Sequence, residues 1–298
     1  MSESSYDISW NDEYGYAQLD PIPSDEVLSE YYQSQYPELL EEGEIADDVS
    51  RLFEDGDEAE RERQWRRTTW YTDYLTVLEE GITDVEKVLD VGCGTGEFVQ
   101  FMEDNNHTSV GIEPSEQIAE VGKDKGLTIH TSTAEQFANT HAKKFDAVTM
   151  FNVLEHVPNI WEVLNSVWEL LRPGGMAIIK VPNEFNPFQL AARDLLNAER
   201  WWISAPAHIS YFDFDSLTAI LSEVGFNIYN RLADFPMSLF LLLGDNYIQN
   251  DDVGSVCHNN RMEFEQTLDD DTRREFYSTL ADGGFGRNCT LFAMKPDN

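Results

Sequence analysis

The sequence predicts an α/β protein built on a doubly wound, mostly parallel seven-stranded sheet. Short apolar runs alternate with helical patterns from about residue 86 onward, which is the order expected of βαβ units. A glycine-rich turn, Gly92–Gly96, follows the first of these runs and precedes a helical pattern. The chain has 298 residues, of which 41% are hydrophobic, and this is sufficient for a sizeable buried core.

The N-terminal part of the chain predicts a helical cap, or lead-in, before the sheet. Its signals in chain order are a turn at Pro21-Ile22-Pro23, a helix N-cap at Ser24, a Tyr-rich helix through Tyr31 and Tyr32, an acidic stretch over Asp47–Asp57, and a helix over Arg61–Glu80 that ends at Gly81. We therefore divide the chain into residues 1–80 and a sheet domain of residues 81–298.

Within the sheet domain, apolar runs and helical periodicity assign each element. The predicted strands are Lys87–Val91, Thr108–Ile112, Leu127–His130, Phe145–Phe151, Met176–Val181, Phe226–Arg231 and Gly286–Lys295. The predicted helices begin at Glu97 and Ser115 or span Val157–Leu171 and Asp213–Val224. Ligands of such sheets bind at the carboxyl ends of the strands.

Two insertions, residues 182–208 and 235–285, interrupt the alternation of strands and helices. Connections of this length usually carry function. We expect both to cover a substrate site at the carboxyl edge of the sheet. The apolar run Phe235–Leu243 fits either a core helix or the apolar wall of that site.

The composition is strongly acidic, with 56 Asp and Glu against 20 Lys and Arg and a formal net charge of −36. This charge repels phosphate backbones and anionic membrane surfaces, so we expect no nucleic-acid partner. The acidity resembles that of proteins from halophilic organisms, in which concentrated salt screens self-repulsion. The surface acids would then reflect the solvent and not the substrate.

The cysteine content limits the kind of site, and the lack of membrane-span and secretory patterns bears on the cellular location of the protein. Three scattered cysteines form neither a disulfide framework nor a CxxC-type zinc site, and we predict no metal. No apolar run has the length of a membrane span, and Met1–Asp12 lacks the pattern of a secretory signal. We therefore expect a cytoplasmic protein that is a monomer or a homodimer.

The stretch Val88–Gly96 carries most of the chemical information. A buried strand runs directly into a turn with three glycines and then into a helix, which lets a ligand approach backbone N–H groups. Glu113 lies 21 positions after Gly92, at the end of the second strand. A carboxylate in that place can accept both hydrogen bonds of a ribose diol.

These motifs resemble those of class I S-adenosylmethionine (SAM) dependent methyltransferases, which have a Rossmann-like fold. The matching segments are Leu89–Gly96, Gly111–Ser115, Ala134-Glu135, Phe145–Val148, Asn152–Val157 and Leu171–Gly175, in the order and spacing of that family. The resemblance is strong over about residues 85–181 and weaker to Lys295. It implies SAM as cofactor and S-adenosylhomocysteine as product.

The resemblance also implies which residues contact the cofactor. Gly92, Cys93, Gly94 and Gly96 belong to the turn beneath the methionine part, and Asp90 helps to order that turn. By the same resemblance, Glu113 binds the ribose, and Pro114, Ala134 and Glu135 contact the adenine. Asn152 and Val153 line the channel of the methyl group. Arg66 or Arg67 on the preceding helix is a candidate partner for the SAM carboxylate.

The methyl acceptor leaves more alternatives open. A base is needed only when the acceptor must lose a proton, and histidine suits that role near neutral pH. His208 lies in a His-x-x-x-aromatic segment that resembles one in small-molecule and glycan methyltransferases, with Tyr211 as a helper. His156 is either functional or a structural helix cap. In the second insertion, Arg261 and His258 are candidate acceptor contacts, although an arginine in a local ion pair is the competing interpretation.

We therefore predict a SAM-dependent methyltransferase that acts on a small molecule or glycan by O- or N-transfer. Alternatives are methylation of a quinone ring or of a macromolecule. A further alternative is a non-catalytic, regulatory SAM-binding protein, which would retain the glycine turn but lack a working acceptor side.

Overall fold

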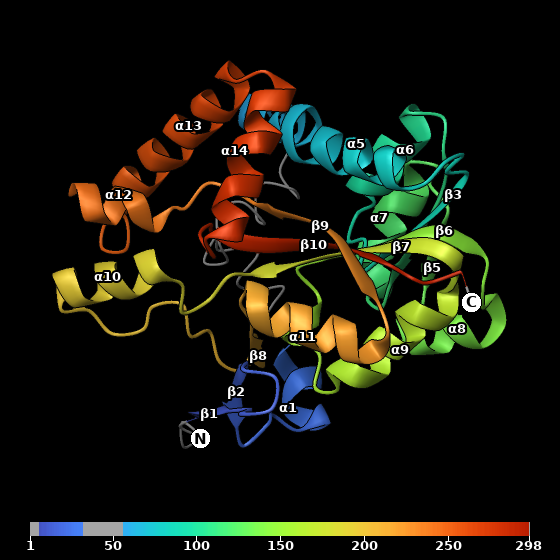
Figure 1. Cartoon of the computed structure of the whole chain (residues 1–298), viewed down its shortest axis with the longest axis horizontal. Coiled ribbons are helices and arrows are strands. Elements are labelled where there is room, and N and C mark those ends of the chain that lie inside the picture. The colour runs from blue at the N-terminus through green and yellow to red at the C-terminus, as the bar shows by residue number, and fades with distance from the viewer. Residues whose placement is uncertain (1–5, 32–55, 298) are drawn as a thin grey trace.

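The computed structural model describes residues 6–31 and 56–297, and its main sheet has the predicted architecture. The seven strands lie in the order β5-β4-β3-β6-β7-β10-β9, and β10 alone runs in the direction opposite to the other six (Figure 1). The strands are β3 (Lys87–Val91), β4 (Thr108–Glu113), β5 (Ile129–Thr131), β6 (Phe145–Phe151), β7 (Leu171–Pro182), β9 (Asn227–Ala233) and β10 (Asn288–Met294). The doubly wound prediction is confirmed.

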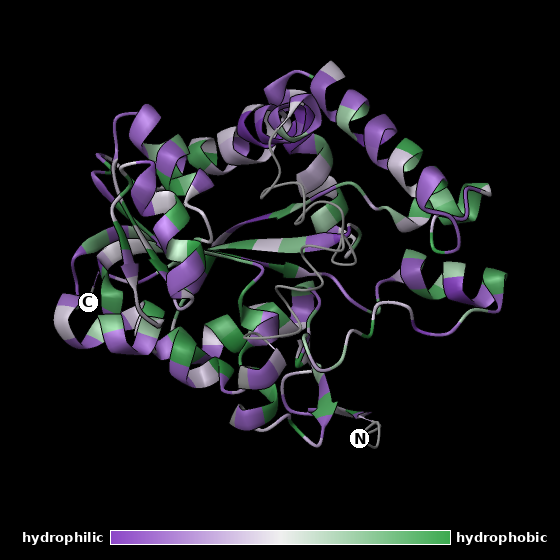
Figure 2. Ribbon diagram, turned by 180° about the vertical axis from the view of Figure 1, so that it is seen from behind, coloured by the Kyte–Doolittle hydropathy of each residue, from purple (hydrophilic) through white to green (hydrophobic). Residues whose placement is uncertain are grey.

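Helices cover both faces of this sheet, as the apolar strands require (Figure 2). One face packs on α8 (Ala134–His141), α9 (Ile160–Leu170) and α11 (Phe214–Val224). The other packs on α5 (Thr72–Gly81), α6 (Glu97–Asp104) and α14 (Asp270–Asp282). The helix α7 (Glu116–Asp124) closes the β5 end of the sheet, where its Ala119 is buried beside Ile129.

Local capping explains several helix ends. The side chain of Ser115 accepts from the backbone N–H of Ile118 and begins α7, and a capping box begins α11 at Asp213. A second capping box, at Thr133, begins α8, a helix that the apolar pattern did not predict. Most of its eight residues are polar, so the cap is a stronger signal there than hydrophobic periodicity.

The N-terminal segment contains a small sheet in addition to the predicted helices. Strands β1 (Asp7–Trp10) and β2 (Ala17–Asp20) form a hairpin, and β2 pairs with β8 (Ser210–Tyr211). Ser24 caps α1 (Asp25–Glu30) as expected. The remainder of the predicted Tyr-rich helix and most of the acidic stretch lie outside the described residues.

The predicted helix over residues 61–80 is longer and is interrupted by a wider turn. It comprises α4 (Asp57–Arg66), the π-helical turn η2 (Arg67–Tyr71) and α5, which ends at Gly81 as predicted. Trp65 and Trp70 from this segment are buried in the second core cluster. The segment therefore does more than lead in to the sheet domain, because its aromatic residues form part of the main core.

Both insertions contain helices, and the second is largely helical. The first contains α10 (Pro187–Leu196), and the second contains α12 (Ser238–Leu243), α13 (Asp251–Thr267) and α14. Buried charges attach the second insertion to α5, since Arg273 donates to both carboxylate oxygens of Asp73 at 2.8 and 2.9 Å. No helix in the described part of the chain is long and apolar enough to cross a bilayer.

The Arg273–Asp73 pair yields a stability prediction. Both side chains are buried, so Arg273→Met leaves Asp73 with only its 3.3 Å contact to Arg274 and should lower the free energy of unfolding by roughly 3 kcal/mol. The double variant Asp73→Asn/Arg273→Met should recover part of that loss in urea unfolding. Strictly additive losses would contradict a direct coupling between the two side chains.

Candidate active site

The glycine turn is held between two strands and one helix at the carboxyl edge of the sheet. The N–H groups of Gly92 and Cys93 both donate to the Ile112 carbonyl, at 2.8 and 3.1 Å, which ties the turn to β4. Gly92 has φ +68°, and a Cβ atom there would lie 2.4 Å from Cγ2 of Val153. A side chain is thus excluded by both conformation and space.

Glu113, at the end of β4, faces this turn. Its Oε2 accepts from the N–H of Gly94 at 3.2 Å and its Oε1 accepts from the N–H of Ser115 at 2.9 Å. Burial raises the pKa of the carboxyl, and these two N–H donors oppose that rise. The carboxylate is therefore oriented by backbone donors, and each oxygen retains acceptor capacity for a ribose hydroxyl.

Asp90 and Cys93 have packing roles that the sequence did not specify. Asp90 accepts a 2.6 Å hydrogen bond from Oγ1 of Thr149 on β6, and this bond, unlike the predicted role, does not reach the glycine turn. Burial raises its pKa to about 7. A Cβ atom built on Gly111 would lie 2.4 Å from the Sγ atom of Cys93. The thiol of Cys93 therefore fills the space beside Gly111 on β4.

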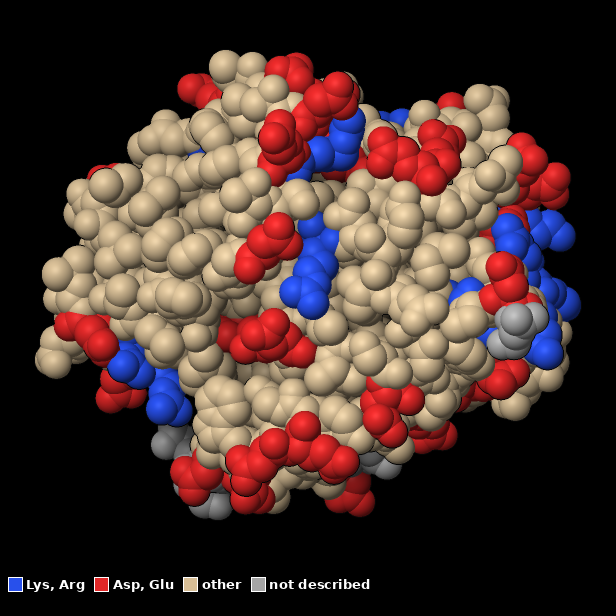
Figure 3. All heavy atoms as spheres, viewed as in Figure 1, with Lys and Arg blue, Asp and Glu red and all other residues tan. Residues whose placement is uncertain are grey.

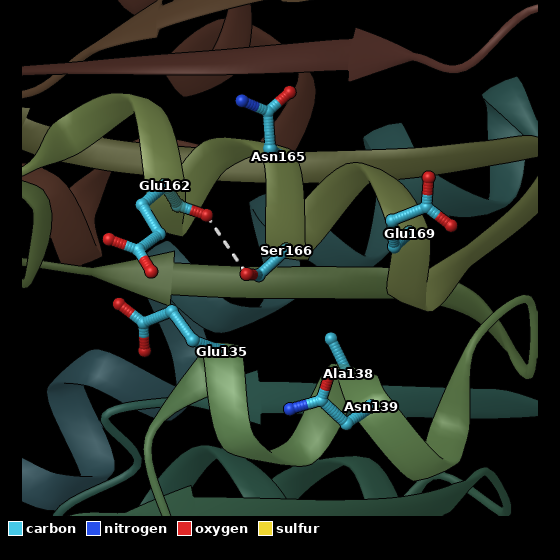
Figure 4. A pocket seen from close by; sticks show the side chains of 7 residues that line it. All are labelled: Glu135, Ala138, Asn139, Glu162, Asn165, Ser166 and Glu169. Carbon is cyan, nitrogen blue, oxygen red and sulfur yellow. Dashed lines mark hydrogen bonds between the residues drawn. The ribbon is translucent and has the colours of Figure 1, made fainter.

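The predicted adenine residues lie at helix N-termini beside β4 and β5. Pro114 precedes the Ser115 cap of α7, and Ala134 is the first residue of α8. Glu135 lines a groove between α8 and α9, where Figure 4 shows its carboxylate directed toward Glu162. The groove residues are Glu135, Ala138, Asn139, Glu162, Asn165, Ser166 and Glu169. The assignment of Glu135 to adenine stays a prediction.

The end of β6 brings the predicted methyl channel to the glycine turn. Asn152 has φ +55°, and its N–H donates to the Lys180 carbonyl of β7 at 2.9 Å. Val153 follows and packs directly against Gly92. The sharp turn at Asn152 therefore directs the chain across the edge of the sheet, toward the 3₁₀ turn η3 (Leu154–His156).

Two histidines and a buried carboxyl meet beyond this turn. The rings of His156 and His208 contact edge to face with centroids 4.8 Å apart. Donor and acceptor atoms of Glu155, His156 and His208 all lie within 4.8 Å of one another. His156 Nδ1 donates to the Ala207 carbonyl at 2.8 Å, which holds η3 against the first insertion.

Burial sets the protonation of this cluster. It raises the pKa of Glu155 to about 8 and lowers the pKa of His208 to about 3, with His156 contributing to the latter shift. The pKa of His156 is also lowered by burial. Both imidazoles are consequently neutral at pH 7, and Nδ1 of His208 has no hydrogen-bond partner among the described residues. Tyr211 directs its hydroxyl to the His208 carbonyl at 2.9 Å and so supports the backbone beside the ring.

The two arginine candidates for the cofactor carboxylate differ in position. Arg67 forms an exposed pair with Asp104 at 2.5 Å. Arg66 is buried. Burial raises the pKa of Glu97, the first residue after the glycine turn, and the positive charge of Arg66 opposes that rise. Arg66 is therefore the candidate beside the turn.

The structure corrects the acceptor-contact assignment of Arg261. Its guanidinium is fully buried and binds Asp234 and Glu265 at 3.2 and 3.1 Å, which is the ion-pair alternative. The ring of Trp65 lies 5.2 Å from its guanidinium carbon. His258, the other acceptor candidate, contacts Glu62 at 2.8 Å. Both residues attach the second insertion to the α4–η2 segment.

Sequence reasoning missed three buried ionisable residues near the acceptor side: Glu155, Lys180 and Glu184. Lys180 places its Nζ 3.6 Å from the ring centroid of Trp70, and Glu184 accepts from Nε2 of Gln189 at 2.6 Å. Burial raises the pKa of Glu184 to about 7. The sequence signal that could have identified these residues is their position at the carboxyl ends of β6 and β7, where ligands of such sheets bind.

The fold and this site define a class I SAM-dependent methyltransferase domain. Residues 32–230, more than half of the chain, match the model of the methyltransferase-domain family, and the chain belongs to that family. It is 37% identical over 108 residues to a ubiquinone biosynthesis O-methyltransferase of Haemophilus ducreyi, covering 33% of this chain and 46% of that protein. A Salmonella newport protein of the same name is 32% identical over 116 residues, covering 37% and 48%. The chain thus spans about half the length of these relatives.

Solved structures with low sequence identity share the fold. A SAM-dependent methyltransferase from Archaeoglobus fulgidus aligns with a TM-score of 0.51 and 19% identity, over 78% of this chain and 94% of that one. The plantazolicin methyltransferase BamL, solved with S-adenosylhomocysteine, aligns with a TM-score of 0.56 and 15% identity, over 91% and 94%. These alignments agree with the Rossmann-like architecture predicted from the motifs.

The raised pKa of Glu155 gives a pH-dependent stability prediction. Burial moves its pKa from 4.5 to about 8, so the folded state binds the proton more tightly than the unfolded state. Its contribution is complete below pH 4.5 and is lost as pH rises through 8. Relative to wild type, Glu155→Gln should therefore gain on the order of 5 kcal/mol of unfolding free energy between pH 4.5 and 8.5. Urea unfolding across that range measures the difference, and parallel pH profiles would contradict the assignment.

Proposed function

We propose that this protein transfers a methyl group from SAM to an oxygen or nitrogen of a small-molecule or glycan acceptor. The observation that carries the proposal is the meeting of the glycine turn, Glu113 and the His156–His208 pair at one edge of the sheet. The glycine turn and Glu113 are suited to bind SAM, the methyl donor. The histidine pair is suited to contact an acceptor beside it. Family membership supports the methyl-transfer chemistry.

The residues at the turn fit the cofactor. A Cβ atom at Gly94 would meet no atom within 4 Å, so the backbone at this position of the turn lies open to a close ligand. In our proposal Glu113 binds the ribose diol, Pro114 and Ala134 flank the adenine, and Asn152 and Val153 line the methyl channel. Arg66 binds the carboxylate of the methionine part, which a guanidinium can hold with two parallel N–H bonds.

The chemistry is an in-line displacement. The cofactor supplies a methyl group on a positively charged sulfur, the acceptor lone pair forms the new bond, and the old bonding pair remains on sulfur as S-adenosylhomocysteine leaves. The chain therefore has to position the acceptor and exclude water. The side chains at the carboxyl ends of β6 and β7 do both, because they are buried and converge from different elements.

The proton of the acceptor passes to the buried cluster. Because the pKa of His208 is lowered to about 3, its imidazole is neutral and can accept a hydrogen bond, but it binds a proton weakly by itself. The neighbouring Glu155 has a pKa raised to about 8, so its ionised form, a minority at pH 7 that grows as the pH approaches 8, is the strongest base of the cluster. In our proposal His208 accepts a hydrogen bond from the acceptor and orients it, and the ionised carboxylate of Glu155 takes up the proton.

A second candidate acceptor is a hydroxyl on a quinone-type ring. The relatives named ubiquinone biosynthesis O-methyltransferases favour it. So does the apolar helix α12, which packs near α10 and exposes Leu243, while α10 exposes Leu195. An acceptor screen should therefore contain phenolic and quinol rings beside sugars and amines.

The acidic surface bears on how such assays are run. Figure 3 shows acidic side chains distributed over the visible face, with fewer basic ones among them. We propose a high-salt cytoplasm as the working environment, where about 1 M salt shortens the Debye length to about 3 Å. Binding and activity are therefore measured in concentrated KCl.

Glu113→Ala tests the cofactor half of the proposal. Calorimetric titration of the wild type with S-adenosylhomocysteine should give a one-site isotherm, and the variant should bind at least roughly tenfold more weakly because the ribose loses its acceptor. Glu116→Ala, an exposed acid in the first turn of α7, is the matched control. Absence of binding by folded wild-type protein would overturn the proposal.

His208→Ala tests the acceptor half. Its kcat should fall by roughly 10²–10⁴-fold while the affinity for S-adenosylhomocysteine is retained, because the ring acts on the acceptor proton and not on the cofactor. His141→Ala, at the end of α8, provides a control with the same chemical change. Unchanged turnover in His208→Ala would exclude the proton role. Binding without turnover of any acceptor by the wild type would instead favour the regulatory alternative.

A further inference from the structure

We propose that the N-terminal hairpin of β1 and β2 is a positioning element of the acceptor site, with Leu19 as its positioning residue. The second strand of the hairpin holds residues 207–212, the segment that carries His208. That segment in turn contacts the backbone of Glu155 on η3. The inference rests on the proposed function, in which His208 and Glu155 act on the acceptor, and it adds the hairpin to the parts of the chain that build this site.

The hairpin and the acceptor cluster are joined through the backbone of Ile209, the residue after His208. The carbonyl of Ile209 accepts from the N–H of Leu19 at 2.9 Å, and the N–H of Ile209 donates to the carbonyl of Glu155 at 2.7 Å. Ile209 is 1% exposed, so water competes little for these hydrogen bonds. The backbone directly after His208 is therefore bonded to β2 on one side and to η3 on the other.

Other contacts hold the same segment from different directions. The N–H of His208 donates to the carbonyl of Ser204 at 2.7 Å, and the carbonyl of His208 accepts from the hydroxyl of Tyr211 at 2.9 Å. The carbonyl of Ala207 accepts from Nδ1 of His156 at 2.8 Å. These bonds tie the segment to its own loop and to η3. The pairing with β2 adds a side that neither of them supplies.

The hairpin is itself anchored away from the first insertion. At its turn, Oδ1 of Asn11 accepts from the N–H groups of Glu13 and Tyr14, both at 3.1 Å, which is a local arrangement that asparagine favours. The ring of Tyr14 packs on Trp161 of α9 with centroids 4.8 Å apart. Figure 1 shows β1, β2 and β8 together beside the main sheet. The hairpin can therefore fix the position of residues 207–212 relative to α9.

The side chain of Leu19 has a second part in this attachment. It is fully buried in a cluster that also contains Ala17, Trp202 and Tyr211, and this cluster is separate from the two that form the core of the main sheet. Ala17 lies opposite Tyr211 in the pairing of β2 with β8. Truncation of Leu19 therefore leaves a cavity between the hairpin and the His208 segment, while the core of the main sheet stays intact.

The test observes the two histidine rings directly by nuclear magnetic resonance, with ring-labelled histidine and in high salt. The edge-to-face contact of His156 and His208 brings ring protons close enough for a nuclear Overhauser cross peak. The variants are Leu19→Ala and a protein in which Leu19 is replaced by its α-hydroxy acid, which changes only the N–H into an ester oxygen. Leu170→Ala, equally buried at the end of α9 and beside the opposite edge of the sheet, is the matched control.

We expect the cross peak to fall at least about twofold in both Leu19 variants, because the His208 segment loses its hold on β2. His208 should also begin to protonate at higher pH than in wild type, since burial lowers its pKa and water then reaches the ring. S-adenosylhomocysteine should bind within about twofold of wild type in calorimetric titration, because the glycine turn lies on other strands. Leu170→Ala should unfold at lower urea concentration and yet keep the cross peak.

A wild-type cross peak in both Leu19 variants would overturn the proposal. The same loss of the cross peak in Leu170→Ala would overturn it too, because general destabilisation would then explain the effect. Loss in Leu19→Ala alone supports it and assigns the hold to the side chain, and the ester variant decides the matter if Leu19→Ala does not fold. Failure of wild type to bind S-adenosylhomocysteine would refute the proposed function, whereas the cross peak would still report whether the hairpin positions His208.

Discussion

The parallel hydrogen-bond ladder between β3 and its two neighbours is the constraint on which the rest of the molecule depends. Asp90 pairs with Gly111 on β4 and with Thr149 on β6, so the three strands end at one level. Their carboxyl ends carry the glycine turn, Glu113 and Asn152. Because the register of a sheet with both faces buried cannot slip without exposing apolar residues, these groups are brought together by the core itself.

Around this edge the protein combines two kinds of polar group. The backbone donors of the turn and α7 orient Glu113 in a partly hydrated position, whereas Glu155, His156 and His208 lie in a drier one. The desolvation that keeps the histidines neutral also makes Glu155 retain its proton. The cofactor side thus relies on preorganised hydrogen bonds, and the acceptor side relies on burial.

Buried charges attach the second insertion to the rest of the protein. Buried ion pairs, among them Arg261 with Asp234 and Arg273 with Asp73, join it to the sheet edge and to α5. Such pairs add little net stability compared with apolar contacts, but they are specific in geometry. Similar specificity lets His258 on α13 and Arg66 on α4 share the Glu62 carboxylate, which links the two helices.

Sequence alone determined the fold class, the glycine turn and the place of Glu113, because continuous apolar strand runs and the conformation of a glycine turn are local properties of the chain. The small hairpin sheet and the pairing of Arg261 with Asp234 were decided only by tertiary structure, whereas α8 has a local signal in its Thr133 capping box. A hairpin with a two-residue pairing to β8, or the pairing of Arg261 with Asp234 across 27 positions of the chain, leaves no local pattern. The meeting of Glu155 with His208 has the same origin, since a long insertion separates them in the chain and only the packed sheet edge makes them neighbours.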